Sequence, residues 1–170
     1  MSYLCIYHKN CADGFGAALA VKNYCDELSV SCHFVPAQYG DEAPDVTGKT
    51  VFIVDFSYDR DTLIELKRQA HSLTVIDHHK SAMEALDGLD YCVFDMDYSG
   101  AVLTWQTLFP KKPVPLLLSY IQDRDLWQWK MPDSKAVSAA LLTINKTLEL
   151  WTPYLADEKV SDLILKGNAI

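Results

Sequence analysis

Six side chains that can bind metal ions or transfer protons lie at or just after the ends of three short apolar segments, residues 3–7, 51–54 and 73–76. These side chains are those of His8, Asp13, Asp55, Asp77, His78 and His79. An aspartate after a strand is more often a helix N-cap, and a histidine pair is more often on the surface. Because the pattern follows three separate segments, the sequence favours one common site over three unrelated caps.

Carboxylates and imidazoles without closely paired thiols suit Mn²⁺, Mg²⁺ or Fe²⁺ better than structural zinc. Two such ions about 3.5–4 Å apart can share a carboxylate, activate water and clamp a phosphoryl oxygen. Asp55 follows the segment expected at the centre of the fold, so it is the natural bridging ligand. We therefore expect one or two ions, with Mn²⁺ first and Mg²⁺, Fe²⁺ or Zn²⁺ as alternatives.

The segments that must position these residues predict an α/β fold. Five segments have the apolar character of strands: residues 3–7, 31–36, 51–54, 73–76 and 91–94. Four helix-like segments lie between or after them: residues 14–25, 59–70, 81–86 and 99–109. This alternation predicts a mostly parallel sheet of about five strands flanked by helices. Ligands bind such sheets beyond the carboxyl ends of the strands, where the six side chains would meet.

After Pro110 the pattern is helical throughout. The expected helices are residues 114–121, 135–144, 148–154 and 160–166. No repeat, low-complexity tract or flexible linker precedes them. We therefore expect an α/β core over residues 1–110 and a helical extension over residues 111–170 that completes the same domain. The four tryptophans of the chain lie in its helical part, where core packing is the favoured interpretation.

The composition excludes several classes of protein. The 170 residues carry 15 Lys and Arg against 23 Asp and Glu, a net charge of −8, which argues against binding a long nucleic acid duplex. No apolar run is long enough to cross a membrane, and the N-terminus lacks the pattern of a signal peptide. Five cysteines without a C-x-x-C pair fit reduced thiols. These features predict a cytoplasmic protein; they do not predict its oligomeric state.

Five ordered motifs resemble those of the DHH phosphoesterase family, which includes RecJ and the nanoRNases. The motifs are residues 7–14, 54–57, 77–79, 98–101 followed by Trp105, and 123–127. They span about three quarters of the chain. The resemblance covers the catalytic domain and leaves out the C-terminal substrate-binding domain usual in the family.

By this resemblance, His8 would bind a first metal ion and Asp13 a second, with Asp55 between them. His78 and either Asp123 or Asp125 would complete the second ion's ligands. Asp77 is a candidate ligand or an orienting partner of a histidine. His79 would lie near the scissile phosphate, so Asp77 and His79 are the candidate catalytic residues.

Three further residues are candidate substrate contacts: Lys80, Arg124 and Ser99. The first two lie beside the expected ligands and could bind phosphate, although ordinary surface charges are an equal alternative. Ser99 precedes a helix, where a capping serine is also expected.

Cys11 departs from the family pattern, since it stands where the first motif usually has an aspartate. A thiolate favours Zn²⁺ or Fe²⁺ over Mn²⁺, which predicts an altered first metal site. The alternative is a buried cysteine beside a single well-held ion.

The resulting hypothesis is a metal-dependent phosphohydrolase that cleaves phosphodiester bonds of short oligonucleotides or small nucleotides by metal-activated water. Its expected partner is a phosphate-containing small molecule or a short oligonucleotide. The alternatives are a non-catalytic or truncated DHH remnant that acts as a binding module, and a hydrolase of pyrophosphate or polyphosphate.

Overall fold

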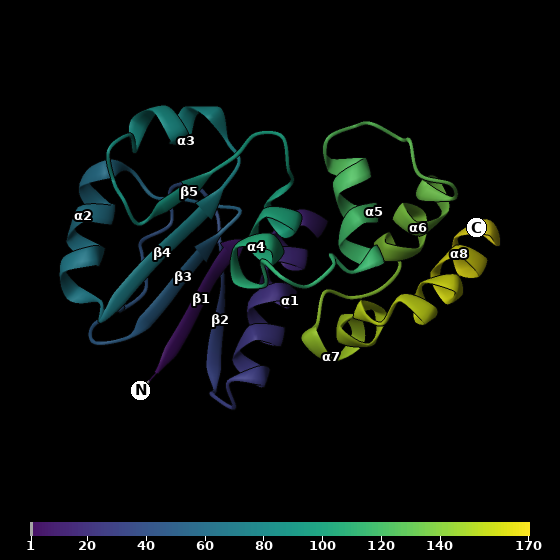
Figure 1. Cartoon of the computed structure of the whole chain (residues 1–170), viewed down its shortest axis with the longest axis horizontal. Coiled ribbons are helices and arrows are strands. Elements are labelled where there is room, and N and C mark those ends of the chain that lie inside the picture. Colours follow the sequence, from purple (N-terminus) through teal and green to yellow (C-terminus); the bar gives the residue numbers. More distant parts are fainter. Residues whose placement is uncertain (1) are drawn as a thin grey trace.

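The computed structural model describes residues 2–170 and contains a five-stranded sheet followed by a group of helices (Figure 1). The strands are β1 (Tyr3–His8), β2 (Cys32–Ala37), β3 (Thr50–Val54), β4 (Ser72–Asp77) and β5 (Cys92–Phe94). All pair in parallel, in the order β2-β1-β3-β4-β5, so β3 is central. This confirms the predicted fold class, with each strand displaced by at most one or two residues from its expected bounds.

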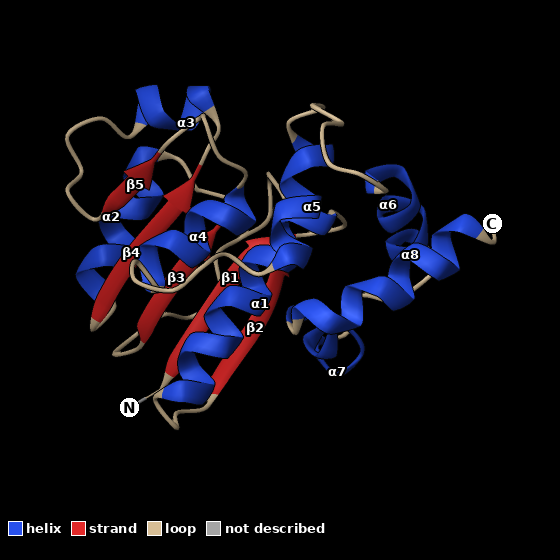
Figure 2. Ribbon diagram, turned by 45° about the vertical axis from the view of Figure 1, so that its right-hand side comes forward, coloured by secondary structure: helices blue, strands red, loops and turns tan. Residues whose placement is uncertain are grey.

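Helices cover both faces of the sheet. The helices that follow the strands are α1 (Ala12–Glu27), α2 (Arg60–Gln69), α3 (Lys80–Ala85) and α4 (Gly100–Leu108). Figure 2 shows α1 and α4 in front of the strands. On that side Phe52 and Val54 of β3 pack with α1, while Val51 and Ile53 pack on the opposite side with Leu63 of α2. Burial on both faces explains why the strand sequences are continuously apolar.

The strand order reverses between β1 and β3. From β1 the chain crosses to β2 on one side, and the next strand, β3, lies on the other side of β1. Such a reversal of strand order is where open α/β sheets bind ligands. His8 ends β1 and Asp55 directly follows β3, so both lie at the carboxyl ends of the two strands where the order reverses.

The rest of the chain is helical, as predicted. It forms α5 (Leu116–Asp125), α6 (Ser134–Leu142), α7 (Leu148–Trp151) and α8 (Val160–Asn168), with short 3-10 helices at Thr152–Leu155 and Asp157–Lys159. These helices lie beside α1 and α4 in Figure 1. One buried apolar cluster joins the two parts, with Phe15 of α1 against Trp151 and further members from α4, α5, α6 and α8. Within residues 2–170, no helix combines the length and apolarity that a bilayer span requires.

Helix α5 runs four residues further than expected. It begins after Pro115 and continues through Asp125, and the backbone leaves the helix at Trp127, whose φ is 55°. Asp123 and Asp125 are therefore both helical. Two residues correspond to about 200° around a helix, so the two carboxylates point in different directions.

Candidate metal centre

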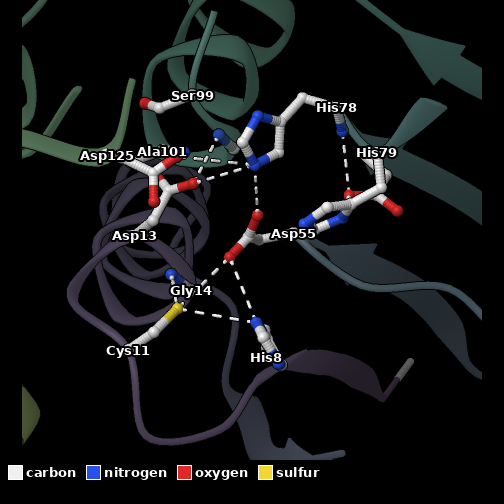
Figure 3. A network of polar contacts seen from close by, with 12 residues as sticks. His8, Cys11, Asp13, Gly14, Asp55, His78, His79, Ser99, Ala101 and Asp125 are labelled. Carbon is white, nitrogen blue, oxygen red and sulfur yellow. Dashed lines mark hydrogen bonds and ion pairs between the residues drawn. The ribbon is translucent and has the colours of Figure 1, made fainter. Parts of the chain in front are cut away.

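A first group of ligand atoms joins the ends of β1 and β3 to the start of α1. Cys11 is the N-cap of α1, and its sulfur accepts the N–H of Gly14 at 3.1 Å. The thiol donates to Oδ2 of Asp55 at 3.4 Å. His8 Nδ1 lies 3.6 Å from the same sulfur and 3.7 Å from Asp55 Oδ2 (Figure 3). The ligand atoms of His8, Cys11 and Asp55 lie within 4.8 Å of one another, a spacing that could hold one ion.

A second group lies on the other side of Asp55. Nε2 of His78 is 3.2 Å from Asp13 Oδ2, 3.7 Å from Asp125 Oδ2 and 3.0 Å from Asp55 Oδ1. Asp13 comes from α1, His78 follows β4, and Asp125 ends α5. Asp13, His78 and Asp125 also have ligand atoms within 4.8 Å of one another.

Asp55 links the two groups, because its two oxygens face different sides. It is 1% exposed, with Oδ2 in the first group and Oδ1 in the second. Among the described residues 2–170, Oδ1 accepts no hydrogen bond of good geometry, and its nearest charged neighbour is the His78 ring nitrogen at 3.0 Å. The His78 ring is thus the neighbour that offsets the charge of this buried oxygen, and a metal cation at the same point would offset it further. The donor set of nitrogen, oxygen and sulfur atoms therefore fits a divalent metal ion, and it could hold two.

The N-terminus of α4 holds the carboxylates in place. The backbone N–H groups of Gly100 and Ala101 each donate to one oxygen of Asp13 at 2.8 Å. A Cβ atom on Gly100 would lie 2.5 Å from Asp55 Oδ1, so only glycine leaves room for that carboxylate. The positive end of the α4 dipole also favours negative charge at this point.

The side chains of the site carry strongly coupled charges. Burial and the charge of Asp55 raise the pKa of Asp13. Burial acts to lower the pKa of His78, but the neighbouring Asp13 and Asp55 carboxylates raise it to about 11. Burial, together with the charge of Asp55, raises the pKa of Cys11 to about 12. In the absence of a metal ion, a protonated His78 thus offsets part of the charge of the buried carboxylates, and Cys11 stays a neutral thiol that donates a hydrogen bond to Asp55.

Asp77 positions the two histidines that follow it. This fully buried carboxylate accepts the backbone N–H of His78 at 2.8 Å and contacts His79 Nδ1 at 2.6 Å, both through Oδ1. Contact with Asp77 raises the pKa of His79. The ligand atoms of Asp77 and His79 also lie within 4.8 Å of those of Asp55 and His78. Asp77 is therefore an orienting partner of the histidines, and Oδ2 remains without a hydrogen bond in the described part of the chain.

The expectation that Asp123 is a metal ligand needs correction. Its two oxygens accept the backbone N–H groups of Lys130 and Met131, at 2.9 and 3.1 Å, and its side chain is buried. Asp123 thus anchors the loop that follows α5. Of the two alternatives offered by the sequence, the structure brings Asp125 to the cluster, because the helix turns the two side chains in different directions.

Ser99 is also not positioned as a substrate contact. It is fully buried, and its hydroxyl accepts the N–H of Val102 as the N-cap of α4. Lys80 is exposed at the first position of α3, and Arg124 is exposed on α5. Both remain candidates for phosphate contacts.

Two features were not predicted from the sequence, and the first of them belongs to the site. Gly100 has no functional side chain, and only its approach to Asp55 reveals its role. Trp127 is 73% exposed two residues after Asp125, with positive φ, so core packing was the wrong interpretation for this tryptophan. Trp105 and Trp151 are buried as expected.

The chain was compared with protein families, curated proteins and solved structures. No protein-family model matches the sequence. Over 96% of its length it is 29% identical to an uncharacterized protein of Acanthamoeba polyphaga mimivirus, and it spans 42% of that protein's length. An uncharacterized protein from Helicobacter pylori matches 98% of this chain with a TM-score of 0.66 and 12% identity, over 63% of its own length.

RecJ from Thermus thermophilus, whose structure was solved in complex with Mn²⁺, matches 99% of this chain with a TM-score of 0.53 and 14% identity. The match covers 33% of the RecJ chain. The chain therefore has a fold like that of RecJ, a member of the DHH family, and spans a minor part of RecJ and of the viral relative.

Proposed function

We propose that this chain is a DHH-type phosphoesterase that uses one or two divalent cations to hydrolyse phosphodiester bonds in short oligonucleotides or small nucleotides. The observation that carries the proposal is the position of Asp55 between two ligand groups, with one oxygen toward each. The fold shared with RecJ and the Mn²⁺ in that structure support the same reading and favour Mn²⁺ as the ion.

Some residues of the site would bind the cations, and His79 would contact the substrate. A cation bound between these ligands would polarise a phosphoryl oxygen and lower the pKa of water. Asp13, Asp55, His78 and Asp125 would hold the second ion, and His8 and Cys11 would share Asp55 in holding the first. The Nδ1–H group of His79 would donate a hydrogen bond to Asp77. The other ring nitrogen, Nε2, would then be available to the phosphate or to the leaving-group oxygen.

Hydrolysis of bis-p-nitrophenyl phosphate and of a dinucleotide with added Mn²⁺ tests the proposal. Asp55→Asn should lower both rates at least about 100-fold, since a direct ligand should contribute at least as much as an outer-shell partner. The matched control is Asp61→Asn, an exposed carboxylate on α2, which should keep the wild-type rate. Equal rates for wild type and Asp55→Asn would remove the enzyme proposal.

Two alternatives are distinct outcomes when pyrophosphate is added to the assay as a third substrate. Cys11 in the first group supports a non-catalytic binding module, which would show no turnover with any of the substrates. Faster phosphate release from pyrophosphate than mononucleotide release from the dinucleotide would instead identify a phosphoanhydride hydrolase. Either result would replace the phosphodiesterase proposal.

A further inference from the structure

A cavity of about 130 Å³ adjoins the candidate metal centre on the side of the C-terminal helices. It lies between the start of α1 and helices α5, α6 and α7, and Cys11 is part of both the cavity wall and the first ligand group. The ligand assignments above do not use this cavity. A molecule bound at the centre could therefore extend into it.

The cavity wall is mostly apolar. Ile121, Val137, Leu141 and Trp151 contribute to it, and all four are buried. A wall of this kind favours the flat surface of a ring over a charged group.

Positive charges gather at the opening. Arg124 and Lys146 line the cavity, and a neighbouring hollow beside Cys11 is lined by Lys9 and again by Lys146. All three are exposed, in a chain whose net charge is −8. A local group of cations on an acidic protein attracts an anion to this point.

We propose that this cavity binds the six-membered ring of a pyrimidine nucleotide, whose phosphate lies toward Arg124, Lys146 and the metal ligands. An apolar cavity of about 150 Å³ is known to admit a benzene-sized ring, so a volume of about 130 Å³ fits one ring better than the fused rings of a purine. This inference rests on the proposed function and deepens it, because it assigns the nucleoside end of the substrate to the C-terminal helices.

The test is equilibrium binding to the full chain with Mn²⁺, with three probes: uridine monophosphate, adenosine monophosphate and inorganic phosphate. Wild type should bind uridine monophosphate at least tenfold more tightly than either of the others. Ser138→Phe places a ring into the cavity from a half-buried position on α6, and it should reduce uridine monophosphate binding to the level of phosphate. Phosphate binding itself should not change. Ser161→Phe, at an exposed position of α8, is the matched control and should retain the wild-type preference for uridine monophosphate.

Equal binding of the three probes to wild type would overturn the inference, and so would an unchanged preference in Ser138→Phe. Tighter binding of adenosine monophosphate would overturn the assignment of a single ring. Should Ser138→Phe fail to fold, Arg124→Gln provides a second measurement. It should weaken uridine monophosphate and phosphate by the same factor, whereas loss of uridine monophosphate binding alone would contradict the proposed phosphate position.

The experiments distinguish an error in the pyrimidine-binding inference from an error in the proposed phosphoesterase function. A chain that hydrolyses dinucleotides without preferring a pyrimidine ring would retain the phosphoesterase and lose the pocket. A chain without hydrolysis that binds uridine monophosphate in a manner sensitive to Ser138→Phe would retain the pocket and lose the phosphoesterase.

Discussion

Cys11 contributes a sulfur atom to a group whose other donors are an imidazole nitrogen and a carboxylate oxygen. In the structure it is a thiol that donates to Asp55, with its pKa raised to about 12 by burial and by the Asp55 charge. A cation in the first group would have to displace this proton. Mn²⁺ prefers oxygen donors, whereas Zn²⁺ and Fe²⁺ accept thiolate readily. At the residue scale, we therefore expect the two ligand groups to differ in metal preference.

Cys11→Asp should convert the first group to oxygen and nitrogen donors and strengthen Mn²⁺ binding there. The expected gain is about tenfold in the dissociation constant, which corresponds to about 1.4 kcal/mol. Isothermal titration of the metal-free protein measures the affinity and the number of ions bound.

Cys11→Ser is the matched control, because it removes the thiol without adding a carboxylate and should not improve Mn²⁺ binding. A sulfur-to-metal absorption band with Co²⁺ should be present in wild type and absent from both variants. If wild type lacks this band, Cys11 does not ligate the ion.

Helices α1 and α4 bring the ligands together because glycines lie where they meet each other and β3. A Cβ atom on Gly16 of α1 would lie 2.9 Å from Ala101 of α4, so this glycine allows close packing of the two helices. Gly100 likewise allows the start of α4 to lie close to the Asp55 side chain. The backbone of Asp55 itself has φ of 55°, a conformation that is costly for a residue with a side chain. At the element scale, packing between helices and the central strand maintains the position of this carboxylate.

Gly100→Ala should disturb the metal centre more than the fold. The new Cβ atom would overlap Asp55 Oδ1 and displace that carboxylate, so Mn²⁺ affinity should fall by about 10–100-fold. Alanine is otherwise well tolerated in a helix, so the free energy of unfolding of the metal-free protein should change by about 1–2 kcal/mol at most. Metal titration and denaturant unfolding measure the two effects.

Gly16→Ala is the control for overpacking, since its Cβ atom would meet only apolar side chains. It should lower stability and leave Mn²⁺ affinity close to wild type. Equal losses of metal affinity in both variants would contradict a specific role of Gly100.

The whole molecule combines an acidic composition with buried carboxylates that gather near the carboxyl ends of the strands. Asp13 and Asp55 are both buried within reach of His78, and their mutual repulsion opposes the folded state in the absence of a cation. A cation that binds the folded state alone stabilises it by mass action. The melting temperature therefore reports on the site without any assumption about substrate.

Adding Mn²⁺ at about 100 times its dissociation constant should stabilise the metal-free protein by about 2.7 kcal/mol. For a chain of this size, that corresponds to a rise of about 5–10 °C in Tm. Asp125→Asn should remove most of this shift, because Asp125 belongs to the second group.

Asp162→Asn, an exposed acid of α8, should retain the full shift, and a chelator should reverse it. An unchanged Tm in saturating Mn²⁺ would show that the centre does not bind this ion.

The order of strands and helices could be predicted from the sequence because it depends on local patterns. Continuous apolar runs indicate strands buried on both faces, and the polar residues that end them, such as His8 and Asp55, lie at the same edge of any parallel sheet. The residues of the two ligand groups could therefore be proposed, apart from the choice between Asp123 and Asp125.

The tertiary structure decided what depends on orientation and on contacts between distant segments. The length and phase of α5 turn Asp125 toward His78 and Asp123 toward the loop at Lys130. Ser99 proved to be a buried cap because α4 packs against α1. Residue types and spacing along one chain determine which donors reach the sheet edge. Which of them face a common point, and which cavity lies beside them, is set by how helices far apart in sequence pack.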